Sequence, residues 1–252
     1  MRPYTTDTTA WQESWDRQQE AYLPDREERF AALLDTVDTV TGGWAPKILD
    51  LAGGTGSISL RALRRFPGAT TTVLDVDPVL QHIARASLDG RSAVVTADLR
   101  GPEWTAALPH REYDAVLTAT ALHWIEADRL AALYGEIRDV LRPGGVFVNA
   151  DHMPDDGLPG FNEKRHARSE ARRAALYAAG AVLSWEDWWA HVAKDPTLGP
   201  LVAERAKVFA NHHSTEWTPP VSWHLDALHA AGYTEVGLVW RGGPDAAVAA
   251  IS

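Results

Sequence analysis

The chain of 252 residues contains no cysteine. This excludes disulfide bonds, thiol nucleophiles and zinc sites with cysteine ligands. No apolar run approaches the roughly 18 residues that a membrane-spanning helix needs. The first 20 residues are polar and acidic rather than an apolar leader. We therefore expect a cytoplasmic protein that does not cross a membrane.

The chain also has fewer basic than acidic residues. The chain has 24 lysine and arginine residues against 34 acidic residues, which gives a formal net charge of −10. Binding of nucleic acids depends on clustered cations, so we expect no nucleic-acid partner. The length suits a single α/β core with an inserted subdomain. We expect one domain over residues 1–252, acting on a small molecule as a monomer or homodimer.

Strand-like and helix-like segments alternate from residue 47 onward, which is typical of βαβ units and a parallel sheet. The expected strands are 47–51, 70–75, 92–97, 113–118, 146–150, 234–240 and 246–251. The expected helices between and after them are 57–66, 78–88, 128–141 and 222–231.

Two segments stand outside this alternation. Residues 1–41 predict an N-terminal helical cap, and residues 151–220 predict a helical insert that forms a lid over the substrate. Several of the 11 tryptophans fall on these two segments. They are Trp11, Trp15, Trp185, Trp188 and Trp189. Neither segment has an evident core of its own, so we expect both to be mobile until a ligand gives them something to pack on.

The most informative segment is residues 47–56, which read KILDLAGGTG. A short apolar strand carries Asp50 near its end and leads into three glycines among four residues. Glycine lets a ligand approach the backbone closely, and N–H groups at a helix start favour an anionic group. Asp75 and Asp98 close the next two expected strands. An acid in the position of Asp75 accepts hydrogen bonds from ribose hydroxyls in dinucleotide folds, whereas Asp77 precedes Pro78 and is expected to cap a helix.

At these residues the chain resembles the class I S-adenosylmethionine-dependent methyltransferases. Their first motif usually reads Leu-Asp-Leu-Gly-Cys-Gly-Thr-Gly, and here Ala52 and Gly53 replace the Gly-Cys pair. The resemblance covers residues 40–150 and, less specifically, 222–252. It implies an α/β fold: a Rossmann-like, doubly wound seven-stranded sheet, mostly parallel with an antiparallel last strand. N-terminal helices and a helical insert after the fifth strand complete it.

The resemblance also implies a cofactor, S-adenosyl-L-methionine, with S-adenosyl-L-homocysteine as product. The glycine turn would hold the methionine portion, Asp75 the ribose, and Asp98 would lie near the adenine amino group. Asp50 would order the turn or the ligand ammonium. The complete set of expected cofactor-binding residues is Asp50, Ala52, Gly53, Gly54, Thr55, Gly56, Asp75, Val76, Asp98, Leu99, Thr118, Ala119, Trp15 and Tyr22.

Residues 113–124, YDAVLTATALHW, resemble the fourth-strand motif of the same family and its continuation. A comparable Ala-Leu-Gln/His-Trp occurs in proteins like trans-aconitate methyltransferase, where it borders the cofactor and the substrate mouth. We expect His123 to be the catalytic residue, because imidazole exchanges protons near neutral pH, although it could instead line the pocket passively. The expected substrate-binding residues are His123, Trp124 and His152. His212 and His213 also fall where a substrate pocket is expected.

No metal is expected, because the histidines show no H-E-x-x-H or similar ligand spacing. A site built from metal-binding side chains just after the fifth strand nevertheless stays open. Its members would be Asp151, His152, Asp155 and Asp156.

The pattern as a whole predicts in-line methyl transfer to a small molecule. That reaction needs little beyond placing a nucleophile about 3 Å from the methyl group. A nicotinamide-dependent oxidoreductase is disfavoured, because the chain lacks G-x-G-x-x-G and no tyrosine is followed four residues later by lysine. A cofactor-binding or regulatory protein that keeps the fold but transfers nothing stays open. The sequence does not indicate the acceptor, nor whether oxygen, nitrogen or carbon is methylated.

Overall fold

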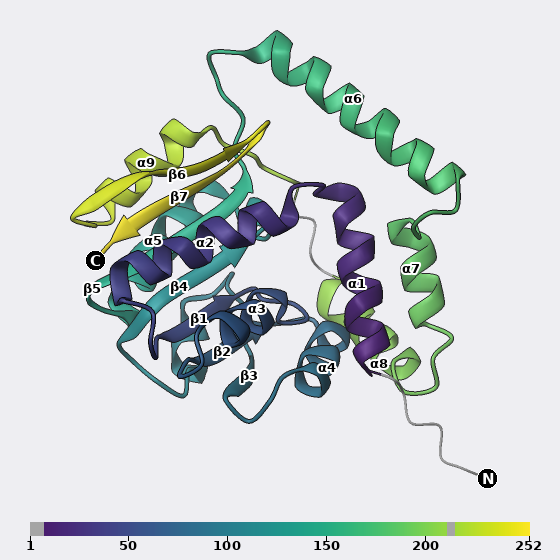
Figure 1. The fold of residues 1–252 in the computed structure, drawn as a ribbon, viewed down its shortest axis with the longest axis horizontal. Helices are drawn as coiled ribbons and strands as arrows, with labels where there is room; N and C mark the ends of the chain where they lie inside the picture. Colours follow the sequence, from purple (N-terminus) through teal and green to yellow (C-terminus); the bar gives the residue numbers. More distant parts are fainter. Residues whose placement is uncertain (1–7, 211–214) are drawn as a thin grey trace.

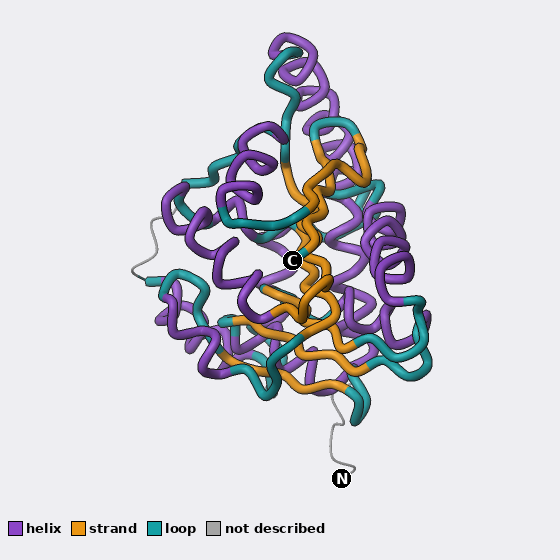
Figure 2. The backbone as a smooth tube through the Cα atoms, turned by 90° about the vertical axis from the view of Figure 1, so that its left-hand side faces the viewer, coloured by secondary structure: helices purple, strands orange, loops and turns teal. Residues whose placement is uncertain are grey.

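The computed structural model describes residues 8–210 and 215–252 of the chain. Seven strands form one sheet that lies between two layers of helices (Figures 1 and 2). The strands are β1 (Lys47–Leu51), β2 (Thr70–Asp75), β3 (Ser92–Thr96), β4 (Tyr113–Ala119), β5 (Leu141–His152), β6 (Glu235–Gly242) and β7 (Asp245–Ile251). Their order is β3-β2-β1-β4-β5-β7-β6. The first five strands pair in parallel, and β7 is antiparallel to both of its neighbours, which confirms the predicted fold.

The helices follow the predicted sequence of elements closely. The α-helices are α1 (Thr8–Tyr22), α2 (Arg26–Thr41), α3 (Ser57–Arg65), α4 (Pro78–Ser87), α5 (Ala127–Val140), α6 (Pro159–Ala178), α7 (Trp185–Val192), α8 (Gly199–Phe209) and α9 (Val221–Ala230). Two short 3₁₀ helices are η1 (Pro102–Ala107) and η2 (Leu122–Trp124). In the part of the chain that is described, none of the helices combines the length and apolarity needed to cross a membrane.

The strands bury alternate side chains in two separate cores, one on each face of the sheet, as the twofold repeat of a β-strand requires. Leu49 of β1 and Phe147 of β5 join the core covered by α5 and α9. Ile48 of β1 and Val148 of β5 join the core covered by α2 and α3. The sheet is thereby fixed between rigid layers, and the loops at its carboxyl edge are held in place.

β5 begins earlier than the sequence predicted. Residues 142–145, Arg-Pro-Gly-Gly, precede the strand expected at 146–150, yet they are part of the observed strand. Leu141 pairs with Tyr113, and the register then shifts before Ala115 pairs with Val146. A Cβ on Gly145 would lie 2.9 Å from a backbone oxygen of Arg142, so this irregular stretch packs too closely for a side chain.

A third buried cluster joins the N-terminal helix to the insert. Trp15 of α1 and Trp188 of α7 pack together with Val79, Leu80 and Ile83 of α4, and Figure 1 shows α1 lying beside α4 and α7. Neither segment has a core of its own, but together with α4 they share one, which the sequence did not predict. Their mobility in the absence of a ligand stays a prediction. The spacing of the tryptophans predicted an aromatic face on each of these two helices, α1 and α7. It did not predict that the two faces pack against each other.

The first insert helix behaves differently from the other two. α6 has no buried residue along its 20 residues, and it projects from the body of the molecule in Figure 1. Its exposed side chains include Phe161, which is 52% accessible. Packing between the insert and the remaining fold is concentrated in α7 and α8. The role of the insert as a lid over the substrate stays a prediction.

Candidate active site

The glycine turn leaves β1 and enters α3 through backbone conformations that favour glycine. Gly54 and Gly56 have φ values of 55° and 75°, in the left-handed region that glycine adopts freely. A Cβ on Gly53 would lie 2.6 Å from the carboxyl group of Asp50, and one on Gly56 would lie 3.0 Å from Leu88. The turn at the carboxyl end of β1 therefore needs glycine at these positions, because a side chain would be strained or would clash with its neighbours.

Asp50 is fully buried beneath this turn. Its Oδ2 atom accepts hydrogen bonds from the backbone N–H and the hydroxyl of Ser59, at 3.0 and 2.8 Å, whereas Oδ1 is buried without a hydrogen-bond partner. Burial raises the pKa of Asp50 to about 7 although the bonds from Ser59 oppose the shift. A buried carboxylate oxygen without a partner is costly. Asp50 thus offers one unmet acceptor beside the turn.

We expect Asp50 to make the folded protein less stable as the pH rises. The folded state keeps a proton up to a pKa of about 7, whereas the model value is 3.8, so the unfolded chain releases this proton first. The contribution is complete below about pH 4 and is lost as the pH rises through about 7, which lowers the free energy of unfolding by about 2 kcal/mol between pH 5 and pH 7. Denaturant titrations of the wild type and of Asp50→Asn at both pH values measure this. The same slope in both proteins would contradict the prediction.

Asp75 lies at the carboxyl end of β2, facing the turn. Its Oδ2 accepts the N–H of Gly54 at 2.8 Å, and its Oδ1 accepts the N–H groups of Val76 and Asp77 at 2.7 and 2.8 Å. A carboxylate has about four acceptor positions, so one remains on Oδ2. Asp77 has the role the sequence predicted: its side chain caps α4 by accepting the N–H groups of Val79 and Leu80.

The remaining expected cofactor residues are spread along the same edge of the sheet. Asp98 follows β3 and pairs with Arg100 at 2.6 Å, with Leu99 buried beside it. Thr118, near the end of β4, is fully buried, and its hydroxyl has no hydrogen-bond partner; Ala119 ends the strand. The structure thus places Asp50, Asp75 and Asp98 at or just beyond the carboxyl ends of three adjacent strands.

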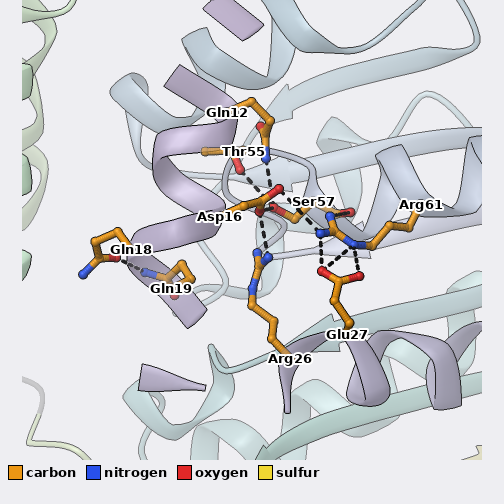
Figure 3. Close-up of polar contacts among 9 residues, drawn as sticks. All are labelled: Gln12, Asp16, Gln18, Gln19, Arg26, Glu27, Thr55, Ser57 and Arg61. Atoms are coloured by element: carbon orange, nitrogen blue, oxygen red, sulfur yellow. Dashed lines mark hydrogen bonds and ion pairs between the residues drawn. The ribbon is translucent and has the colours of Figure 1, made fainter. Parts of the chain in front are cut away.

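Helix α1 closes over the start of α3 through a polar network (Figure 3). Asp16 accepts hydrogen bonds from the Ser57 hydroxyl at 2.8 Å and from Arg26 at 2.7 Å. Gln12 donates to the same Ser57 hydroxyl at 3.1 Å, and Thr55 lies 3.2 Å from it. A carboxylate near the N-terminus of α3 is favourable, because the helix carries partial positive charge there. These contacts fix α1 next to the glycine turn.

The two aromatic residues of α1 that were expected to bind the cofactor take part in packing between helices. Trp15 is 9% accessible, and its ring contacts Trp188 at 5.1 Å and Trp185 at 5.9 Å between centroids. The guanidinium of Arg173 on α6 lies 4.8 Å from the ring of Tyr22. The direct role of both residues in cofactor binding stays a prediction, and the polar residues Gln12 and Asp16 are the part of α1 that reaches the turn.

His123 and His152 face each other beyond the ends of β4 and β5. Nδ1 of His123 lies 2.7 Å from Asp151, and Nδ1 of His152 lies 2.7 Å from Asp245; the two rings are 5.1 Å apart between centroids. Burial would raise the pKa of Asp151, but the charge of His123 and its hydrogen bond lower it to about 2. Burial likewise opposes the charge on His152, but Asp245 raises the pKa of His152 overall. Each imidazole is therefore held by an ionised carboxylate.

Backbone strain marks two positions around this site. Ala52 and Thr120 have φ values of 53° and 52°, a region in which a β-branched residue such as threonine is a clear outlier. Strained residues of this kind concentrate at functional sites. Ala52 occupies the position where the methyltransferase motif usually has glycine, and its positive φ gives the physical reason for glycine there. Thr120 leads from β4 into η2, and its N–H donates to the Ala150 carbonyl at 2.9 Å.

Sequence reasoning missed most of the charged residues that hold the histidines. Asp245 opens β7, the strand that runs back beside β5, and the register pairs it with His152; the predicted antiparallel last strand contained that signal. Glu216, in the segment before α9, has an oxygen 3.9 Å from Nε2 of His123, and no sequence pattern indicates it. His212 and His213 lie outside the described residues.

The metal site that the sequence left open is not assembled. Asp155 accepts the N–H of Gly157 and Asp156 accepts the hydroxyl of Ser222, so neither joins His152. Among the residues that the structure describes, a different group of three converges: ligand atoms of His123, His152 and Glu216 lie within 4.8 Å of one another.

Part of the chain matches a known protein family. Residues 48–145 match a family model described as a methyltransferase domain. These residues match a methyltransferase domain, and the seven-stranded sheet to which they belong has the class I methyltransferase fold. The match begins in β1, just before the glycine turn, and ends within β5, so it includes Asp50, Asp75 and His123. The narrower resemblance to proteins like trans-aconitate methyltransferase stays a prediction.

Individual relatives match the methyltransferase domain rather than whole proteins. An uncharacterised methyltransferase of Mycobacterium tuberculosis is 32% identical over 111 residues, which are 44% of this chain and 42% of that protein. The demethylmenaquinone methyltransferase of Thermus thermophilus is 38% identical over 111 residues, 44% of this chain and 49% of that protein. The chain thus matches less than half the length of these curated relatives.

Among solved structures, the S-adenosylmethionine-dependent methyltransferase SibL in its apo form has a TM-score of 0.57 and 18% sequence identity. The superposition covers 90% of this chain and 55% of SibL. At this level of identity the likeness establishes the fold alone. It extends well beyond the matched domain, so the helical additions to the methyltransferase domain are themselves compatible with a methyltransferase architecture.

Proposed function

We propose that this chain is an enzyme that methylates a small-molecule acceptor with S-adenosylmethionine as cofactor and S-adenosylhomocysteine as product. The observation that carries the proposal is the glycine turn, with Asp50 below it and Asp75 facing it across the carboxyl edge of the sheet. In an open α/β sheet, ligands bind at this edge. When bound, the cofactor supplies a methyl group that its sulfonium charge has already activated.

The residues present fit such a cofactor. The unpartnered Oδ1 of Asp50 is an acceptor for a cationic ammonium group, and the glycines of the turn present backbone without side chains. The remaining acceptor position on Oδ2 of Asp75 suits one ribose hydroxyl. A contact to both hydroxyls requires Asp75 to release one of its backbone hydrogen bonds.

The acceptor would lie on the His123 side of the same edge, against Trp124 and His152. When His123 is neutral and its Nδ1–H donates to Asp151, the lone pair of the imidazole is on Nε2. A lone pair directed toward the acceptor can receive a proton or bind a cation. Either activity assists transfer to a hydroxyl, whereas a protein that only binds the cofactor has no use for it. The paired histidines therefore favour an enzyme over a regulatory protein.

The proposal also includes the class of acceptor, the location of the enzyme and its oligomeric state. The net charge of −10 makes a small molecule a better acceptor candidate than a nucleic acid. We place the enzyme in the cytoplasm as a monomer or homodimer, with α7 and α8 as the part of the insert that covers the acceptor.

Replacement of Asp75 tests the cofactor site. We expect Asp75→Ala to weaken the binding of S-adenosylmethionine by roughly 10- to 150-fold, because a hydrogen bond to a charged group contributes about 1.5–3 kcal/mol. Isothermal titration calorimetry with S-adenosylmethionine and S-adenosylhomocysteine measures this. Unchanged affinity in a folded variant would remove the main support for the proposal.

Asp77→Ala is the matched control, because it removes the neighbouring carboxylate without touching the proposed ribose contact. Asp77 caps α4 and also pairs with Arg205 at 2.5 Å. Its loss should lower the free energy of unfolding by about 1 kcal/mol and leave cofactor affinity within about twofold. A loss of affinity equal to that of Asp75→Ala would point to a general disturbance of the loop instead.

A further inference from the structure

His123, His152 and Glu216 converge from three different parts of the chain. His123 lies in η2 after β4, His152 ends β5, and Glu216 precedes α9. Their ligand atoms lie within 4.8 Å of one another, and an oxygen of Glu216 is 3.9 Å from Nε2 of His123. In a tetrahedral site with bonds of about 2 Å, ligand atoms are about 3.3 Å apart. Side-chain adjustment alone would bring the three groups to that spacing, since Glu216 is half exposed.

Both imidazoles are held in the way that metal-binding histidines are held. Asp151 accepts Nδ1 of His123, and Asp245 accepts Nδ1 of His152, each at 2.7 Å. The second oxygen of Asp245 is itself fixed by buried Arg29 at 2.5 Å. Metal-binding histidines almost always donate their other ring N–H to a carboxylate or carbonyl, which fixes the tautomer and orients the ring. Here two neighbouring histidines share that arrangement, and both keep Nε2 for a ligand.

Three carboxyl groups surround the two rings. Asp151 and Asp245 are buried against the Nδ1 atoms, and half-exposed Glu216 lies on the Nε2 side of His123, whereas buried Arg29 contacts Asp245. Carboxylates that lie close together repel one another unless protons or cations neutralise them. A bound metal ion would remove this repulsion.

We propose that His123, His152 and Glu216 bind a divalent transition-metal ion through Nε2 of each imidazole and the Glu216 carboxylate. Two imidazoles and one carboxylate suit zinc and its first-row neighbours, whereas magnesium prefers oxygen ligands. Three protein ligands leave an open position. The link to catalysis rests on the proposed function: the open position faces the acceptor, which would then be a molecule that offers an oxygen ligand. In that case His123 activates the acceptor by holding the ion rather than by receiving a proton.

Cobalt(II) and zinc(II) are the probes for this site. The full-length protein, freed of metals with a chelator, should bind one equivalent of Co²⁺ with the visible absorbance of a four- or five-coordinate ion, and Zn²⁺ should displace it. We expect Glu216→Gln and His152→Ala each to weaken binding at least tenfold. Asp245→Asn should weaken it by about 10- to 100-fold, because it loosens His152 without removing a ligand. The exposed position of Glu216 makes Glu216→Gln the variant that is safest for folding.

His166→Ala is the matched control, because His166 forms a surface pair with Glu170 at 3.4 Å on α6, far more exposed than the site. It should leave Co²⁺ binding unchanged. Absence of saturable binding, or equal binding by wild type, Glu216→Gln and His152→Ala, would overturn the metal site. Calorimetry with S-adenosylmethionine on the same samples separates the two proposals: cofactor binding without Co²⁺ binding refutes the metal site alone, and Co²⁺ binding without cofactor binding refutes the proposed function alone.

Discussion

His123→Ala should reduce the formation of S-adenosylhomocysteine by about 100- to 10,000-fold, the range typical for loss of a group that activates the acceptor. The affinity for S-adenosylmethionine should stay within about twofold, because His123 follows β4 whereas the glycine turn follows β1. Turnover can be followed with a deproteinised small-molecule extract of bacterial cells as the source of acceptor. The expected result does not depend on how Nε2 acts, because the alanine removes its lone pair in either case.

Two further variants decide whether the imidazole itself is responsible. Asp151→Asn keeps the volume of the side chain but places an amide N–H against Nδ1 of His123 in one orientation, which favours the wrong tautomer; turnover should fall although the ring is still present. Trp124→Ala is the control, since Trp124 is 49% accessible and its ring lies 5.1 Å from that of His123 between centroids. It should change the acceptor concentration needed for half-maximal rate more than the maximal rate. Full turnover in a folded His123→Ala protein would exclude a catalytic role.

The strands, their order of appearance and the glycine turn were predictable because they depend on local sequence. The short apolar run of β1, the cap at Asp77 and the glycines at positive φ are each decided within a few residues. The same holds for Asp50, Asp75 and Asp98, since a residue at the end of a parallel strand must lie at the carboxyl edge of the sheet. These parts of the prediction required no knowledge of how distant segments meet.

The support around His123 was harder to predict because it depends on contacts between distant segments. Asp245 reaches His152 only because β7 returns antiparallel to β5 in a particular register. Glu216 lies in a segment without regular structure, whose path follows from the packing of α8 and α9. The tryptophans pose the same difficulty, because helical spacing shows that Trp185, Trp188 and Trp189 are present but not which ring is buried. Only the assembled structure distinguishes Trp188, which is fully buried, from Trp185, which is 37% accessible.

Trp188→Ala should lower the free energy of unfolding by about 3–5 kcal/mol, as for other buried large-to-small changes in a packed core. The ring lies at 5.1 Å from Trp15 and 6.0 Å from Trp11, edge to face, and its N–H donates to Ser14 at 3.1 Å. These contacts join α7 to α1, and α1 in turn reaches the glycine turn through Asp16. We therefore expect hydrogen exchange to accelerate over residues 10–22 and cofactor affinity to fall, although no residue that touches the cofactor site has been changed.

Trp185→Ala removes a ring of the same size one turn earlier on α7 and is the matched control. Because Trp185 is partly exposed, this change should lower the free energy of unfolding by only about 1 kcal/mol, with little effect on exchange in α1. Hydrogen exchange measured by mass spectrometry, with and without S-adenosylhomocysteine, compares the two variants directly. If the ligand restores protection of residues 10–22 in Trp188→Ala, then α1 is held by the cofactor as well as by Trp188. Unaltered exchange of α1 in that variant would instead show that the polar contacts of Asp16 and Gln12 hold the helix without the tryptophan cluster.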